Sequence, residues 1–379
     1  MNVKCTALKS VVDRHDGIVI RSNIDNSFRL KKRSKLFILG NPFARSIEDN
    51  LVILVFELAT FKFEFSYLEF PSDNIAILDR YAPDLIYEEE MWAFSVIENP
   101  GSFSTNIEKS NLISNRGIVD LQFGFHPVSV DISNQRRRQM LKIWEHIKNR
   151  DCIVLTFGTN DRWIDSSTGF SIADAPLQPM IAREHWGRFS FTTLSFSDTF
   201  NYVKETIDLI TSISPKNKFH FTMAPVPIRK NFCFQDILNA NEACKEKLRS
   251  ICDEIIDQYF EVDYLPSYEM ISICSSDVSF RKELLHLRQE AVSKIVSLLR
   301  ESYFSDVGDI RIHLEQSFRE LSTELNNTDS MERVLSHLPI GALSAKDALL
   351  CCRIAWRCKK RYIAKELLIF FFEVVTPNA

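Results

Sequence analysis

The residues best suited to chemistry follow an apolar run in the middle of the chain. Residues 152–157 predict a buried strand, because Val, Leu and Phe fit a sheet that is covered on both faces. The strand ends in Gly158-Thr159-Asn160-Asp161, whose Gly and Asn tolerate the backbone angles of a tight turn. Ligands of open α/β sheets bind just beyond the carboxyl ends of the strands. The turn therefore offers the Gly158 amide, the Asn160 side chain and the Asp161 carboxylate where a site is expected.

A second candidate for chemistry is His286, which follows Glu283 by three residues. A His side chain has a pKa suited to proton transfer near neutrality, and a carboxylate at this spacing can orient its ring. An amide N–H from Gly158 and the side-chain NH₂ of Asn160 can stabilise a developing oxyanion. Together these residues predict the base and the oxyanion half of a nucleophilic hydrolase.

The elements that must position these residues alternate between strand and helix. The alternation over residues 36–302 predicts an α/β domain with a mostly parallel sheet and helices on both faces. A polar lead-in of residues 1–35 precedes it, and a small helical appendage of residues 303–379 follows it. Residues 161–195 show no clear periodicity and have the length of a functional lid. Strands are expected at 36–40, 60–70, 152–157, 218–223 and 259–262, and helices at 133–150, 196–213, 235–258 and 281–301.

An ordered set of short motifs from residue 36 to residue 300 resembles the GSCFA family, within the SGNH (GDSL-type) hydrolases. The motifs are Gly40-Asn41-Pro42-Phe43-Ala44-Arg45-Ser46-Ile47, Gly158-Thr159-Asn160-Asp161, Ala224-Pro225-Val226-Pro227, Asn241-x-x-x-Lys245, Leu265-Pro266-Ser267-Tyr268-Glu269 and Glu283-Leu284-Leu285-His286. The resemblance implies an SGNH-hydrolase-like (flavodoxin-like) sheet and an ester hydrolase or O-acyltransferase that acts on an acylated carbohydrate or similar small molecule. It implies catalytic positions at His286, Glu283, Asn160, Gly158 and Asn41, and substrate contacts at Arg45, Asp161, His185, Asn241 and Lys245.

The chain departs from the family pattern at the nucleophile. The family's Ser is expected where Asn41 stands, and its Cys where Pro42 stands. An Asn amide cannot accept an acyl group as the nucleophile of an esterase, and Ser46, on the following helix, is expected to point away from the turn. The family's Asp is Glu283 here, which keeps the charge on a longer arm. Two alternatives to an active hydrolase therefore stay open: a non-catalytic binding module and a scaffold in polysaccharide assembly.

One further glycine of the superfamily pattern is not fixed by the sequence. It is expected in the loop-rich region before the helix at 133–150, and both Gly117 and Gly124 fit it.

Composition argues against several classes of protein. The net charge of −4 gives no case for nucleic-acid binding, and 10 glycines without a GxGxxG or GxxxxGK[ST] motif argue against a nucleotide cofactor. The nine cysteines include no Cys-x-x-Cys pair, so no metal site is expected and the thiols are predicted to be reduced. The beginning of the chain lacks a signal-peptide pattern, and the apolar run 367–372 is too short to span a bilayer, so we expect a cytoplasmic protein.

The sequence of residues 345–373 is typical of a basic amphipathic helix. Its cations are Arg353, Arg357, Lys359, Lys360, Arg361 and Lys365. Such a helix can contact a protein partner or a membrane surface, or it can pack on the domain and leave its basic face in water.

Overall fold

The computed structural model describes residues 12–304, except 32–33, 54–55, 61–62, 64–74, 104–110, 115–116, 124–126, 174–183 and 186. Most of the strand expected at 60–70 lies outside the described residues, and so do the expected helical appendage and the basic segment 345–373. The three-part division of the chain therefore stays a prediction. No helix among the described residues is both long and apolar enough to cross a membrane.

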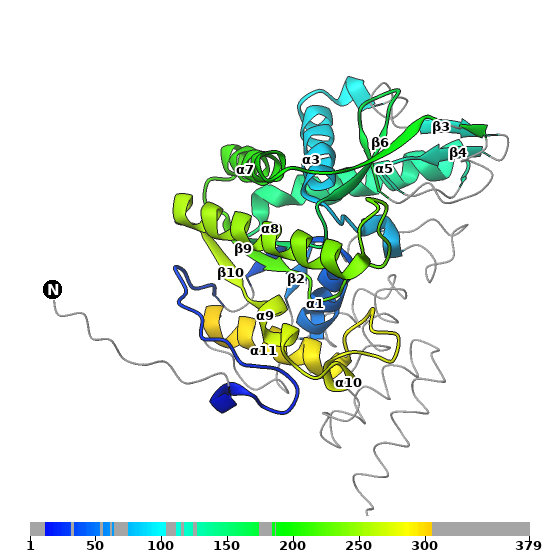
Figure 1. The fold of residues 1–379 in the computed structure, drawn as a ribbon. Helices are drawn as coiled ribbons and strands as arrows, with labels where there is room; N and C mark the ends of the chain where they lie inside the picture. Colours follow the sequence, from blue (N-terminus) through cyan, green and yellow to red (C-terminus); the bar gives the residue numbers. More distant parts are fainter. Residues whose placement is uncertain are drawn as a thin grey trace, which may run out of the picture.

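A five-stranded parallel sheet forms the centre of the molecule, and the α/β prediction is confirmed (Figure 1). Its strands run in the order β10-β9-β5-β1-β2. Their bounds are Val262–Leu265 (β10), Lys218–Met223 (β9), Cys152–Phe157 (β5), Lys35–Gly40 (β1) and Glu57–Leu58 (β2). Every residue of β5 is buried, as a central strand covered on both faces requires.

Helices cover both faces of this sheet (Figure 1). Alternate strand residues point to opposite faces, so Phe37 and Ile153 belong to one hydrophobic core and Leu36 and Val154 to the other. The first core includes side chains of α3 (Pro83–Glu98), α5 (Val130–Glu145), α7 (Phe196–Ile213) and α8 (Ile237–Gln258). The second includes side chains of α1 (Pro42–Ile53), α9 (Ser267–Ser272) and α11 (Gln289–Tyr303).

Two smaller antiparallel sheets accompany the main sheet. One is the hairpin of β3 (Asn111–Ser114) and β4 (Gly117–Asp120), and the other has the order β7-β6-β8. The strands of the second sheet are β6 (Asp161–Asp165), β7 (Ser171–Ile172) and β8 (Phe189–Thr193). The region 161–195, which lacks periodicity in the sequence, therefore contains regular strands. The sequence pattern does not reveal β6 and β8 because they are short and only partly buried, and β7 has only two residues.

The helix expected at 281–301 begins later than the sequence indicates. α11 starts at Gln289, and Glu283 and His286 lie in the turn between α10 (Ser276–Ser279) and α11. Leu284, between them, has a φ of 60°, in the left-handed region that a helix does not contain. A positive φ in a Leu is not visible in the hydrophobic pattern, which explains the early start in the prediction.

The last residue of β1 is a glycine for a steric reason. Gly40 has a φ of +141°, and a Cβ built on it would lie 1.9 Å from Thr156 Oγ1 and 2.3 Å from Thr156 O. Because the neighbouring strand β5 is buried along its whole length, neither Thr156 Oγ1 nor Thr156 O has room to move away. The close approach of β1 to β5 therefore depends on the missing side chain.

We expect Gly40→Ala to lower the free energy of unfolding by about 3 kcal/mol or more, through overpacking and strain at a special φ. Gly169→Ala is the matched control, because Gly169 also has a positive φ, +77°, but no atom lies within 4 Å of a Cβ built there. The control should lose only about 1–2 kcal/mol, the cost of a left-handed conformation. Urea unfolding of both variants measures the difference, and equal losses would contradict the steric explanation.

Candidate functional site

Three strand ends meet at one edge of the main sheet. In the parallel register Gly40 is paired with Thr156, and Thr156 with Thr222. The segments that follow β1, β5 and β9 therefore leave the sheet side by side. This edge is where the sequence places the candidate site.

A segment that the sequence analysis did not single out joins two of these strand ends. Arg80 N donates to Gly40 O at 2.7 Å, and the backbone N–H groups of Gly158 and Thr159 both donate to Tyr81 O at 3.0 Å. Residues 79–81 thus continue the hydrogen bonding of the sheet between β1 and β5. The only sequence signal nearby is Pro83 at the start of α3, which predicts a helix but not this contact.

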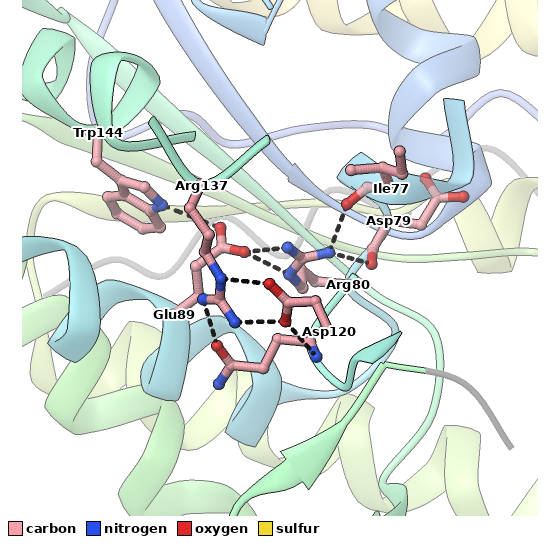
Figure 2. Close-up of polar contacts among 8 residues, drawn as sticks. Ile77, Asp79, Arg80, Glu89, Asp120, Arg137 and Trp144 are labelled. Atoms are coloured by element: carbon pink, nitrogen blue, oxygen red, sulfur yellow. Dashed lines mark hydrogen bonds and ion pairs between the residues drawn. The ribbon is translucent and has the colours of Figure 1, made fainter. Parts of the chain in front are cut away.

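A buried ion pair holds this segment in place, as Figure 2 shows. Arg80 Nε donates to Glu89 Oε2 at 2.6 Å, and a second guanidinium nitrogen pairs with the same carboxylate. Arg80 Nη1 donates to the carbonyls of Ile77 and Asp79, both at 2.8 Å, and Trp144 Nε1 donates to Glu89 Oε1 at 2.9 Å. Both charges are buried and hydrogen-bonded, which is the condition under which a buried pair is tolerated.

A second buried pair lies beside the first (Figure 2). Arg137 contacts Asp120 through two parallel hydrogen bonds of 2.6 and 2.5 Å and also donates to Gln122. The guanidinium groups of Arg80 and Arg137 lie 5.1 and 4.8 Å from the ring centroid of Phe123. The Phe123 ring thus lies within cation–π distance of both guanidinium groups and stabilises both charges.

Asn41, at the expected nucleophile position, is buried and hydrogen-bonded. Its side-chain oxygen accepts from Phe43 N at 3.0 Å and from Thr156 Oγ1 at 3.4 Å. Its Nδ2 lies against Gly158, where an added Cβ would come within 2.5 Å of it. The structure thus brings Asn41 and Gly158 together, and the amide of Asn41 packs between β1 and β5.

The expected oxyanion donors have partners within the protein. The Gly158 amide donates to Tyr81 O, as described above. Asn160 has an exposed fraction of 0%, and its Nδ2 donates to Leu194 O at 3.0 Å while Leu194 N donates to its carbonyl. These bonds join the turn after β5 to Leu194, the residue that follows β8. Asn160 Oδ1 has no partner among the described residues.

His286 and Glu283 form a pair in the turn before α11. His286 Nδ1 lies 2.9 Å from Glu283 Oε1, and both side chains are exposed, at 59% and 44%. A backbone hydrogen bond and the His286 ring lower the pKa of Glu283. No hydrogen bond within the described residues joins this pair to Asn41, Gly158 or Asn160. The structure therefore keeps His286 and Glu283 together as an exposed pair, and no hydrogen bond of the described residues joins the pair to the buried groups Asn41 and Asn160.

Lys245 is a buried cation that contacts two of the strand ends. Its Nζ donates to Gly158 O at 3.0 Å and to Ala224 O at 2.8 Å. Burial lowers the pKa of Lys245 to about 8. One turn earlier on α8, Asn241 Oδ1 accepts from Ile228 N at 3.0 Å. The Asn-x-x-x-Lys spacing thus fastens the segments after β5 and β9 to one face of α8.

The other expected substrate contacts differ in exposure. Arg45 is buried and donates to Ile38 O at 2.9 Å, with Glu48 at 2.7 Å. Asp161 is half-buried and accepts from Thr193 Oγ1 at 2.7 Å, and burial raises its pKa. His185 is partly buried, and its Nε2 has no hydrogen-bond partner among the described residues.

Of the two candidate glycines, Gly117 begins β4 in a hairpin, and Gly124 lies outside the described residues. The described residues contain no group of three or more His, Cys, Asp or Glu side chains that could hold a metal ion.

Comparison with known proteins establishes the family. The model of the GSCFA family matches residues 35–298 of the chain. The chain belongs to the GSCFA family. The resemblance drawn from the short motifs is therefore confirmed. The matched residues begin with β1, include the whole main sheet, and end within α11.

Other comparisons add little for this GSCFA chain. No curated protein matches its sequence. Among solved structures, a family 3 carbohydrate esterase of Clostridium thermocellum is similar, with 10% identity and a TM-score of 0.30 over 72% of this chain and 94% of that chain. A likeness of this size supports no conclusion about activity.

We expect Glu89→Gln to lower the free energy of unfolding of the GSCFA chain by about 3–5 kcal/mol, because Arg80 keeps its buried charge but loses its partner. Asp208→Asn is the control, since it removes an acid from the exposed Lys204–Asp208 pair of α7 and should change little. Urea unfolding at neutral pH measures both. A loss for Glu89→Gln as small as that of the control would show that the buried pair is dispensable.

Lys245 predicts a specific pH dependence of stability. Between its folded pKa of about 8 and its ordinary value of 10.5, the unfolded chain holds a proton that the folded chain has released. The free energy of unfolding must therefore gain a favourable contribution as the pH rises through this window. Urea unfolding from pH 7 to 10 should show the native chain gaining stability relative to Lys245→Met, in which this titration is absent. Parallel profiles would contradict a depressed pKa of Lys245.

Proposed function

We propose that this GSCFA protein is an SGNH-like hydrolase fold without a nucleophile, which binds an ester ligand such as an acylated carbohydrate and does not turn it over. The proposal rests on the burial and the hydrogen bonds of Asn41. An esterase needs an oxygen or sulfur nucleophile that a substrate carbonyl can reach. Asn41 has an exposed fraction of 2%, and its side-chain oxygen is already an acceptor for Phe43 N and Thr156 Oγ1.

The neighbouring hydroxyls of Thr156 and Ser46 are not placed to replace it. Thr156 Oγ1 is buried within β5 and donates to Asn41. Ser46 lies one turn into α1, and its hydroxyl donates to Pro42 O at 3.3 Å. Both hydroxyl protons thus stay within the protein, and neither residue has a hydrogen bond to His286.

The expected oxyanion donors also argue against acyl transfer at this edge. An oxyanion hole needs N–H groups that point at the place where charge develops. The Gly158 amide instead donates to Tyr81 O, and the Asn160 amide to Leu194 O. Half-buried Thr159 and Asp161 keep polar groups partly accessible at the strand ends, and these groups suit ligand binding better than acyl transfer.

A specific observation favours hydrolysis as the second candidate. The hydrogen bond between His286 and Glu283 is the arrangement that orients a histidine as a general base. In that case His286 would activate water directly, and no acyl-enzyme would form.

Ester hydrolysis distinguishes the two candidates. We expect the native chain to hydrolyse p-nitrophenyl acetate at the rate of buffer, with no burst and no labelling by a fluorophosphonate probe. His286→Ala should leave that rate unchanged. Hydrolysis above background that falls tenfold or more in His286→Ala would establish the second candidate instead.

The binding half of the proposal is measured on the same preparations. Titration calorimetry with an acetylated xylo-oligosaccharide should show binding to the native chain that Asp161→Ala weakens, with Asp257→Ala, on the exposed face of α8, as the control. If the native chain neither hydrolyses nor binds the acetylated sugar, the proposed ligand is wrong.

A further inference from the structure

The segment after β9 carries an unusual exposed apolar patch into the start of α8. Phe234, Ile237 and Leu238 have exposed fractions of 105%, 38% and 73%. An exposed fraction above 100% means that no neighbouring group covers the Phe234 ring, so the ring projects from the surface. Single exposed apolar residues are ordinary, but adjacent ones mark an interaction surface.

The backbone turns between Phe232 and Phe234, so that the Phe232 ring packs on the protein and the Phe234 ring faces outward. The ring of Phe232 contacts Trp163 and Phe191, with centroids 5.1 and 5.5 Å apart. Phe234 has a φ of 59°, a conformation that is rare and strained for a bulky residue. The surrounding contacts must therefore hold Phe234 in its outward position.

Side-chain hydrogen bonds supply these contacts. Asn231 Oδ1 accepts from Cys233 N at 2.8 Å, and Asn231 Nδ2 donates to Gln235 O at 2.7 Å. Asp236 Oδ1 accepts from Leu238 N at 2.9 Å and caps α8. The patch is thus built on a fixed turn next to a helix end.

Two cations stand on the same segment. Arg229 and Lys230 are exposed, and neither forms an ion pair with a described residue. The acid nearest in sequence, Asp236, is engaged as the helix cap. The segment therefore combines projecting apolar side chains with unpaired positive charge.

We propose that residues 229–238 dock the protein on an anionic phospholipid surface. Phe234 and Leu238 enter the boundary between headgroups and acyl chains, and Arg229 and Lys230 contact the lipid phosphates. A fluid layer accommodates a ring that projects freely, whereas a protein partner would need a matching pocket. Because the segment follows β9, docking turns the sheet edge with Asn41 and Gly158 toward the lipid surface. Docking on lipid does not require that this edge turn over a substrate.

The test is cosedimentation of the full chain with vesicles of phosphatidylcholine alone and with vesicles that also contain phosphatidylserine. We expect preferential, salt-sensitive binding to the anionic vesicles. Replacing Arg229 and Lys230 by Gln should weaken it by about fivefold for each charge. Phe234→Asn and Leu238→Gln should also weaken it, and Asn suits the positive φ, so this variant should unfold at no lower urea concentration than the native chain.

The matched control is Phe260→Ser, since Phe260 is 78% exposed at the opposite end of α8 and away from the two cations. This variant should bind like the native chain. Equal binding to neutral and anionic vesicles, or full binding by a Phe234→Asn/Leu238→Gln double variant, would overturn the proposal. So would loss of binding only when Arg353 and Arg357 are replaced, or loss of self-association rather than vesicle binding in the loop variants.

Discussion

The buried ion pair between Arg80 and Glu89 is the contact on which the strand-end edge depends. Through its backbone, the segment that carries Arg80 bonds to the end of β1, and through Tyr81 O to the turn after β5. The side chain of Arg80 fixes that segment to α3 through Glu89 and, through the indole of Trp144, to α5 (Figure 2). A charge pair in this position is directional, because only one placement satisfies both the guanidinium and the carboxylate. It therefore sets the position of two turns that are distant in sequence.

At the same edge, polar groups of the family motifs form hydrogen bonds that hold the fold together. Buried polar groups need partners, and here the Gly158 amide, the Asn160 side chain and Lys245 Nζ find them in Tyr81 O, Leu194 O and Gly158 O. Each of these bonds joins the turn after β5 to another segment. Their combined effect is a junction in which the turn after β5 is hydrogen-bonded to three other segments of the chain.

The sequence was informative wherever a local pattern had one structural meaning. Mainly apolar runs predicted β1 and β5, because a strand covered on both faces lacks regular polar alternation. It was less informative where a residue depends on distant neighbours. The strands β6 and β8 are short and half exposed, so their pattern is weak. The turn before α11 contains Leu284 at positive φ, which helical periodicity cannot reveal.

The sequence by itself determined the family, the parallel sheet and the absence of a Ser or Cys at position 41, because these are properties of residue type, order and spacing. Only the tertiary structure decided what the polar groups of the motifs contact. Gly158 and Asn160 have the right types for an oxyanion site, yet their N–H groups donate to Tyr81 O and Leu194 O. The physical reason is that a hydrogen bond is settled by whichever partner the fold brings within about 3 Å. No spacing along the chain states which partner that will be.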